Sequence, residues 1–277
     1  MTDLFRIRDH VTDFEGHVAG YRAASAATRA RLPSRLGLAY GPDADERIDL
    51  YFPDRPHAGL PVHLFVHGGY WRAFSREDYA FVADAITDAG AIAAVMDYTL
   101  MPAVRMETLV GQVRRAAAWL AETAPEHGGD PARITASGHS AGAHLASYLV
   151  ARGPHEPAVT LPPVRGVVLL SGLYDLAPLT GSFLQAEIGL TDDEVRNRSP
   201  LGATWTDAPA TVVVGAEETA PFHEQARALA GARVVMLPGE DHMTIVWQYF
   251  LPRGPDGPRG GKTRDGNLWR AAFAANG

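Results

Sequence analysis

Short apolar runs and amphipathic segments alternate along most of the chain. The apolar runs predict strands at residues 47–52, 62–66, 91–96, 133–137, 164–170, 211–214 and 233–237. The amphipathic segments predict helices at residues 76–89, 104–122 and 141–151. Strands that alternate with helices form a mostly parallel sheet with helices on both faces. The pattern therefore predicts an α/β fold whose ligands bind at the carboxyl ends of the strands.

Three segments depart from this alternation. Residues 1–45 show helical spacing of their apolar positions and predict an N-terminal helical extension before a main domain at 46–252. Within that domain, residues 172–209 separate two strands and are expected to form a small cap. Residues 253–277 begin with a stretch dense in Gly, Pro and charge, which predicts a C-terminal tail. Two short helices are predicted in the cap, at 183–189 and 192–197.

Composition narrows the functional classes. The 277 residues are 46% hydrophobic, which suits one large domain with a buried core. A formal charge of −7 argues against nucleic-acid binding, which needs a basic surface, so a small neutral or aromatic substrate is expected. The chain has no cysteine, which excludes disulfides, thiolate metal sites and a cysteine nucleophile. No apolar stretch has the length of a membrane span or a secretion signal, so a cytoplasmic protein without a membrane partner is expected.

Residues 138–142 read Gly-His-Ser-Ala-Gly, directly after a predicted strand and directly before a predicted helix. This is the setting of the nucleophile elbow, a tight turn that exposes a serine hydroxyl at a helix N-terminus in α/β hydrolases. A Gly-x-Ser-x-Gly sequence that arises by chance is not expected to fall between a strand and a helix. We therefore predict Ser140 as the nucleophile and the amide of Ala141 as an oxyanion donor. His139 is expected to have a local structural role.

Residues 67–71 read His-Gly-Gly-Tyr-Trp and also follow a predicted strand. The segment is similar to the loop that supplies oxyanion donors in lipases and esterases. Glycines let backbone amides turn toward the substrate oxygen, where they stabilise the charge of the transition state. Gly69 and Tyr70 are the predicted donors, with Gly68 as a structural partner and His67 as a residue that holds the loop.

The general base should be a histidine late in the chain, because a triad on this fold runs in the order serine, acid, histidine. His242 lies five residues beyond the end of the predicted strand 233–237, in a loop that could reach the nucleophile. His155, in a proline-rich turn, and His223, at a helix start, are poorer candidates. His242 is therefore the predicted base.

The acid should follow the preceding strand, and two adjacent glutamates, Glu217 and Glu218, lie there. Either carboxylate would fix the imidazole tautomer and stabilise the imidazolium. The residues alone do not separate the two. Asp241 is a poorer candidate because it directly precedes His242, and Asp207 lies before the strand, at its wrong end.

The His-Gly-Gly-Tyr-Trp and Gly-His-Ser-Ala-Gly-Ala-His-Leu segments together resemble the kynurenine formamidases, or arylformamidases, of the esterase and lipase branch of the α/β hydrolases. Residues 171–176 and 97–100 also resemble that family, and the resemblance covers residues 45–250. It implies an α/β-hydrolase fold and hydrolysis of N-formyl-L-kynurenine to L-kynurenine and formate, a step of tryptophan catabolism.

The same resemblance bears on single residues. In that family the acid precedes an aromatic residue and then a glutamine, which matches Glu218 before Phe222 and Gln225 and favours Glu218 as the acid. It also assigns the oxyanion role to Gly69 and Tyr70. The chain departs from the family in its Glu-Glu-Thr-Ala-Pro-Phe acid loop and in the tail after Arg253, so the substrate is the least specific part of the resemblance.

Aromatic residues near strand ends suggest an aromatic substrate. Tyr70, Trp71 and Tyr98 are the residues expected to contact it, although ordinary core packing is the alternative for each.

Three functions fit these residues. The first is an aryl formamidase that forms an acyl-enzyme on Ser140, and the second is a carboxylesterase for short-chain or aromatic esters. The third is a non-catalytic ligand-binding protein on the same scaffold, which normally lacks a triad member. A metal hydrolase is disfavoured because His139 and His144 stand five residues apart without a His-Glu-x-x-His motif, so no metal or cofactor is expected. The oligomeric state stays open, with a homodimer as one alternative.

Overall fold

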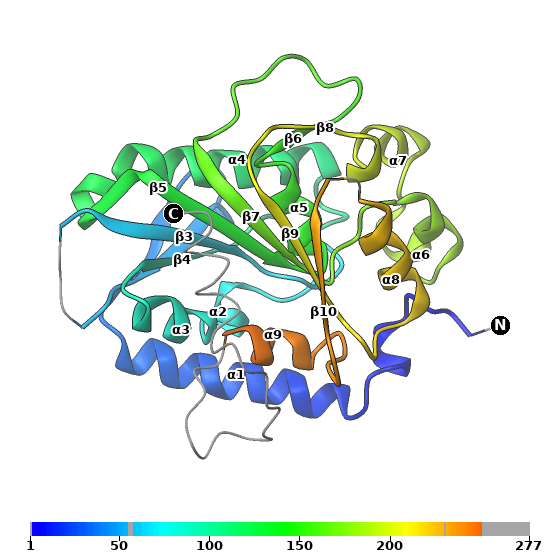
Figure 1. The fold of residues 1–277 in the computed structure, drawn as a ribbon, viewed down its shortest axis with the longest axis horizontal. Helices are drawn as coiled ribbons and strands as arrows, with labels where there is room; N and C mark the ends of the chain where they lie inside the picture. Colours follow the sequence, from blue (N-terminus) through cyan, green and yellow to red (C-terminus); the bar gives the residue numbers. More distant parts are fainter. Residues whose placement is uncertain (1, 55–57, 230, 251–277) are drawn as a thin grey trace.

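The computed structural model describes residues 2–54, 58–229 and 231–250. Eight strands form its central sheet (Figure 1). In chain order they are β1 (Ser34–Ala39), β2 (Arg47–Tyr51), β3 (Leu60–Val66), β4 (Ile92–Met96), β5 (Gly129–His139), β7 (Val164–Leu170), β9 (Ala210–Gly215) and β10 (Arg233–Leu237). In space their order is β1-β2-β4-β3-β5-β7-β9-β10. Strand β2 pairs antiparallel with both neighbours, and the pairs from β4 to β10 are parallel.

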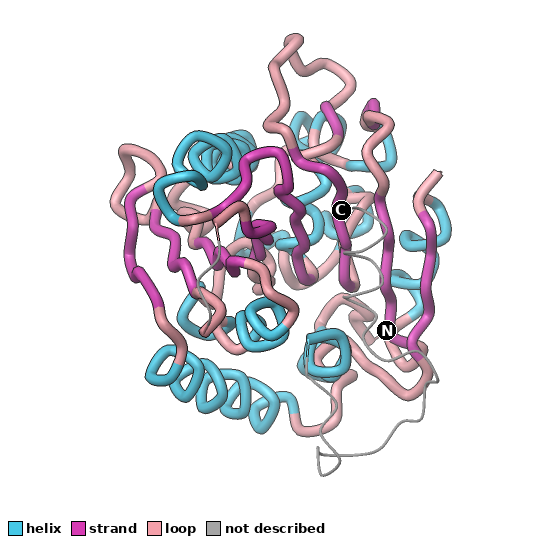
Figure 2. The backbone as a smooth tube through the Cα atoms, turned by 60° about the vertical axis from the view of Figure 1, so that its left-hand side comes forward, coloured by secondary structure: helices cyan, strands magenta, loops and turns pink. Residues whose placement is uncertain are grey.

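Helices cover both faces of this sheet (Figures 1 and 2). One layer contains α1 (Phe14–Arg31), α2 (Arg76–Tyr79), α3 (Val82–Asp88) and α9 (Thr244–Phe250), and the other contains α4 (Met106–Thr123) and α5 (Ala141–Ser147). Strands β3 and β4 are buried almost throughout, as expected for parallel strands between two helix layers. The mostly parallel α/β architecture predicted from the sequence is therefore confirmed.

Smaller elements complete the described part of the chain. Helices α6 (Gln185–Ile188) and α7 (Asp192–Asn197) lie in the expected cap, and α8 (Ala220–Ala228) follows β9. Strands β6 (Ala151–Arg152) and β8 (Thr204–Trp205) pair as a separate two-stranded ribbon. The 3₁₀ helices are η1 (Ile7–Asp9), η2 (Ala124–His127), η3 (Ala177–Gly181) and η4 (Pro200–Gly202).

The predicted helix at 76–89 is two helices, α2 and α3, with a break at Ala80 and Phe81. The amide of Phe81 donates to the Ser25 hydroxyl of α1 at 3.1 Å. A bond to another element therefore replaces one that a continuous helix would make. The periodic pattern could not reveal this, because Ser25 lies far away in the sequence.

The N-terminal 45 residues are not purely helical. They contain α1, as predicted, and also β1, which is the edge strand of the sheet and pairs with β2. Strand β1 was missed because most of its residues are exposed and its register shifts between Arg35 and Leu38, so it lacks a regular apolar alternation. The predicted tail at 253–277 lies outside the described residues.

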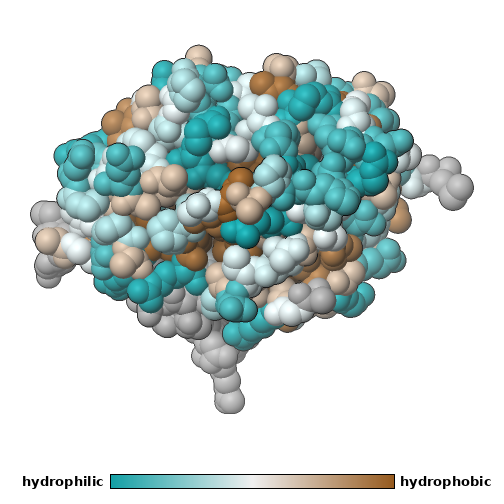
Figure 3. Space-filling view, turned by 90° about the horizontal axis from the view of Figure 1, so that it is seen from above, coloured by the Kyte–Doolittle hydropathy of each residue, from teal (hydrophilic) through white to brown (hydrophobic). Residues whose placement is uncertain are grey.

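No helix in the described ranges is both long and apolar enough to cross a bilayer. The face shown in Figure 3 carries mainly hydrophilic residues with smaller hydrophobic patches between them.

Candidate active site

Ser140 occupies the turn between β5 and α5. Its backbone has φ 55° and ψ −119°, a strained conformation for a residue with a side chain, and its amide donates to Leu170 O at 2.8 Å. The flanking glycines are required by space. A Cβ on Gly138 would lie 2.2 Å from the carbonyl oxygen of Gly142, and a Cβ on Gly142 would lie 2.1 Å from that of Val66. The structure thus contains the strand, turn and helix that the motif predicts.

The glycine-rich loop after β3 lies beside this turn. Gly69 has φ 108°, and a Cβ there would lie 2.2 Å from Ala73 O, so only glycine fits. Tyr70 also has a positive φ, of 50°. Gly69 and Tyr70 line the same cavity as Ser140. Ala141 begins α5, where the first amides have no acceptor within the helix and point toward that end.

His242 follows β10 and bonds to the carboxylate of Glu218. Its Nδ1 lies 2.8 Å from Glu218 Oε2. The other carboxylate oxygen, Oε1, accepts from the Ser171 hydroxyl at 2.5 Å and from the Gly215 amide at 2.8 Å. Glu218 is buried, whereas Glu217 is exposed. The geometry therefore selects Glu218 from the two adjacent glutamates.

This pairing sets the roles of the imidazole nitrogens. A carboxylate only accepts hydrogen bonds, so Nδ1 of His242 carries a proton and Nε2 of the neutral ring is an acceptor. Such an Nε2 is the atom that takes a proton from a serine hydroxyl in a triad.

His139 connects the turn at Ser140 to the loop that carries His242. Its Nε2 lies 2.9 Å from His242 O, and its Nδ1 lies 3.1 Å from the hydroxyl of Tyr79. A carbonyl only accepts, so Nε2 donates and Nδ1 accepts from Tyr79. Burial lowers the pKa of His139 well below its ordinary value and keeps the ring neutral. His139 therefore has the local structural role expected of it, and it holds the backbone of His242 in place.

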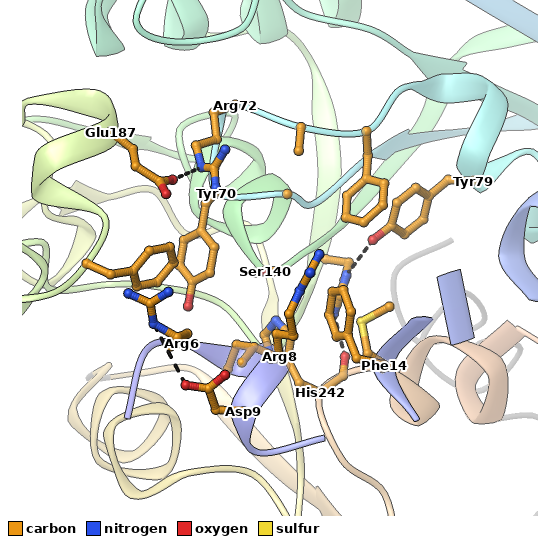
Figure 4. Close-up of a pocket in the computed structure, with 17 residues that line it drawn as sticks. Arg6, Arg8, Asp9, Phe14, Tyr70, Arg72, Tyr79, Ser140, Glu187 and His242 are labelled. Carbon is orange, nitrogen blue, oxygen red and sulfur yellow. Dashed lines mark hydrogen bonds and ion pairs between the residues drawn. The ribbon is translucent and has the colours of Figure 1, made fainter. Parts of the chain in front are cut away.

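Ser140 and His242 line a cavity of about 410 Å³ (Figure 4). This volume suits a small organic ligand. The glycine-rich loop forms one wall, and Phe183 and Glu187 of the 172–209 segment contribute another. The N-terminal segment supplies a third wall through Arg6, Ile7, Arg8, Asp9 and Phe14.

The other candidates for acid and base have different roles. Asp241 accepts from the amides of Met243 and Thr244, each at 2.8 Å, and so caps the start of α9. Asp207 and His155 are exposed and do not line this cavity.

Comparisons with known proteins relate the chain to formamidases and esterases. The BD-FAE family model matches residues 48–160. A kynurenine formamidase from Salmo salar is 26% identical over 84% of this chain and 83% of its own length. The chain is an α/β hydrolase related to the kynurenine formamidases. A crystal structure of a protein from Silicibacter sp. has the same fold, with a TM-score of 0.78, 25% identity and coverage of 91% of this chain and 95% of that one.

The hydrolase also resembles part of an esterase. LipQ from Mycobacterium tuberculosis is 33% identical over 52% of this chain, a match that covers 33% of LipQ itself.

Two of the predicted substrate contacts of the hydrolase do not line the cavity. Trp71 is fully buried and donates its indole N–H to His144 Nδ1 at 3.2 Å. Tyr98 is also buried, stacks on His67 with ring centroids 4.3 Å apart, and donates to His67 O at 3.0 Å. Trp71 therefore anchors the glycine-rich loop in the core, and Tyr98 supports the loop from the core. Tyr70 does line the cavity.

Sequence reasoning missed some residues of this hydrolase that shape the site. Ser171 orients Glu218, and its place immediately after β7, at the carboxyl edge of the sheet, was an available signal. The N-terminal wall had no signal, because neither motif nor periodicity relates residues 6–9 to the nucleophile turn. Among the described residues, no group of three or more His, Asp and Glu side chains is arranged to hold a metal ion.

Proposed function

We propose that this hydrolase cleaves an aryl formamide, N-formyl-L-kynurenine, to L-kynurenine and formate through an acyl-enzyme on Ser140. The observation that carries the proposal is the His242–Glu218 hydrogen bond of 2.8 Å beside the cavity that Ser140 lines. The choice of substrate is supported by the 26% identity with the Salmo salar kynurenine formamidase over most of both chains.

The first half of the reaction forms the acyl-enzyme. Ser140 Oγ attacks the formyl carbon, and its proton passes to His242 Nε2. The new imidazolium is stabilised by Glu218, which bonds to Nδ1 at 2.8 Å. The C–N bond then breaks, and His242 returns the proton to the departing aryl amine. A formyl ester on Ser140 remains.

In the second half, water attacks the formyl ester while His242 Nε2 takes a proton from that water. The bond to Ser140 Oγ breaks, Oγ regains a proton from His242, and formate leaves. In this proposal the amides of Gly69, Tyr70 and Ala141 stabilise the negative oxygen in both halves. The role is supported by the place of Gly69 and Tyr70 on the cavity and of Ala141 at the start of a helix.

The proposal is tested with Ser140→Ala. We expect the wild type to release formate and kynurenine from N-formyl-L-kynurenine in equal amounts, and the variant to lose at least about 10³-fold in kcat because the nucleophile is gone. Thermal unfolding of both proteins checks that the variant is folded. No hydrolysis of the formamide by the wild type would refute the substrate, and activity that survives in the variant would refute the nucleophile.

A carboxylesterase is the second candidate. It is supported by the 33% identity with the esterase LipQ over about half of this chain. Esters and aryl formamides pass through similar tetrahedral intermediates, so the same residues could serve either. Rates on 4-nitrophenyl acetate measured beside those on N-formyl-L-kynurenine separate the two, because a carboxylesterase would cleave only the ester.

A role in tryptophan catabolism and a cytoplasmic location stay predictions that accompany the formamide proposal. Cell fractionation and the growth of a deletion strain on tryptophan would test them.

A further inference from the structure

The N-terminal segment is tied to three parts of the active site. Phe5 O accepts a hydrogen bond from the hydroxyl of Tyr70, in the glycine-rich loop. Leu4 O accepts from the hydroxyl of Thr219, next to the acid, at 2.8 Å. The carboxylate of Asp3 accepts from the Phe183 amide of the 172–209 segment at 2.6 Å. These three hydrogen bonds hold the N-terminal segment in place as one wall of the cavity.

This wall brings positive charge to the cavity of a chain whose formal charge is −7. Three arginines line the cavity: Arg6, Arg8 and Arg72. Figure 4 shows Arg6 joined to Asp9 and Arg72 joined to Glu187, and both acids line the cavity as well. The positive charges of Arg6 and Arg72 are therefore each offset by an acid that also lines the cavity.

Arg8 is different. It lines the same cavity as Ser140, and its guanidinium carbon lies 5.4 Å from the centroid of the Phe14 ring. None of the acids that line the cavity pairs with it. Its partner is Glu15, outside the cavity, at 3.0 Å, and both side chains are 68% exposed. An ion pair this exposed contributes little to the stability of the fold, because solvent screens the charges and both side chains lose conformational freedom. An anion inside the cavity can therefore take the place of Glu15 easily.

We infer that Arg8 is a specificity-determining residue that binds a carboxylate on the leaving group of the substrate. The substrate class is then an aryl formamide or aryl ester whose aromatic part carries a carboxylate. A guanidinium presents several donors in a plane and binds a carboxylate through two of them. The inference rests on the proposed hydrolase site, since the bound group must lie beside Ser140.

The test compares Arg8→Gln with the wild type on two substrates that differ only at the carboxylate, N-formyl-L-kynurenine and its methyl ester. We expect the variant to raise KM for the acid by about tenfold, the loss of one charge-assisted contact, with kcat changed less than about twofold. For the methyl ester, KM and kcat should stay at wild-type values. Arg31→Gln is the matched control, because Arg31 is also exposed, at 58%, and paired with a carboxylate, that of Asp84, but does not line the cavity.

Two results would overturn the inference: an unchanged KM for the acid, or an equal rise for acid and ester. If the formamide is not cleaved at all, the proposed substrate fails while Arg8 can still be tested. The pair is then phenyl acetate and a phenyl acetate with a carboxymethyl group on its ring. The same selective rise in KM is expected for the charged ester, and its absence would refute the role of Arg8.

Discussion

The carboxylate of Glu218 shows how much a single residue depends on its surroundings. Glu217 and Glu218 are adjacent and chemically identical, yet one is exposed and the other is buried against His242. Donors from Ser171 and Gly215 occupy Oε1 of Glu218 and leave Oε2 for the imidazole. The orientation of His242 therefore depends on this one carboxylate.

Replacing each glutamate by glutamine tests this assignment. Glu218→Gln should lower kcat by about 10³-fold or more, because an amide no longer favours the imidazole tautomer with a proton on Nδ1 and does not stabilise the imidazolium. Glu217→Gln is the matched control and should stay within about twofold of the wild type, because an exposed carboxylate away from His242 is screened by solvent. If Glu217→Gln lowered kcat more than Glu218→Gln does, Glu217 and not Glu218 would be the acid of the triad.

At the scale of elements, the site depends on how closely β3, β5 and α5 approach one another. The first turn of α5 lies against the end of β3 at Gly142, where a Cβ would be 2.1 Å from Val66 O and 2.4 Å from His67 O. Both contacts are backbone atoms, which cannot move aside without moving the glycine-rich loop. One small residue therefore permits the turn at Ser140 to approach the glycine-rich loop this closely.

Gly142→Ala should accordingly destabilise the protein by about 1–3 kcal/mol, the usual range of overpacking, and should lower kcat in whatever protein remains folded. Urea unfolding at constant pH measures the free energy of unfolding. Gly181→Ala is the control, because a Cβ there meets no atom within 4 Å, and it should be nearly neutral. If Gly142→Ala unfolds like the control, the close approach is not a constraint.

The whole molecule contains several histidines that burial keeps neutral. Burial lowers the pKa of His63 to about 3 and that of His144 to about 4, and it lowers the pKa of His67 and His139 as well. In the unfolded chain a histidine titrates near pH 6.5. Between these values the unfolded chain binds more protons than the folded protein, so the stability is fully present above about pH 6.5 and is lost as the pH falls toward 4.

The contribution of one histidine can be isolated. Each histidine that stays neutral in the fold adds up to about 1.4 kcal/mol per pH unit to the slope of unfolding free energy against pH. His63→Gln should reduce the slope around pH 5 by about that amount, whatever it does to stability at pH 7.5. His155→Gln, which alters an exposed histidine, serves as the control. An unchanged slope in His63→Gln would mean that His63 is protonated in the folded state.

The sequence alone determined the features that depend on neighbouring residues. Alternating apolar runs predicted the sheet and most helices, because periodicity reports which face of an element is buried. The Gly-His-Ser-Ala-Gly motif predicted the turn at Ser140, because only glycine fits at both flanks of so tight a turn. These are local requirements, so the order of residues is enough to state them.

Only the tertiary structure decided which residues meet from distant parts of the chain. It paired His242 with Glu218 instead of Glu217, buried Trp71 and Tyr98, which were expected to contact the substrate, and placed Arg8 on the cavity. The contact from Tyr70 to Phe5 spans 65 residues, and that from Thr219 to Leu4 spans 215. Such contacts follow from the packing of the whole chain around its core, because no periodic or motif signal relates residues so far apart.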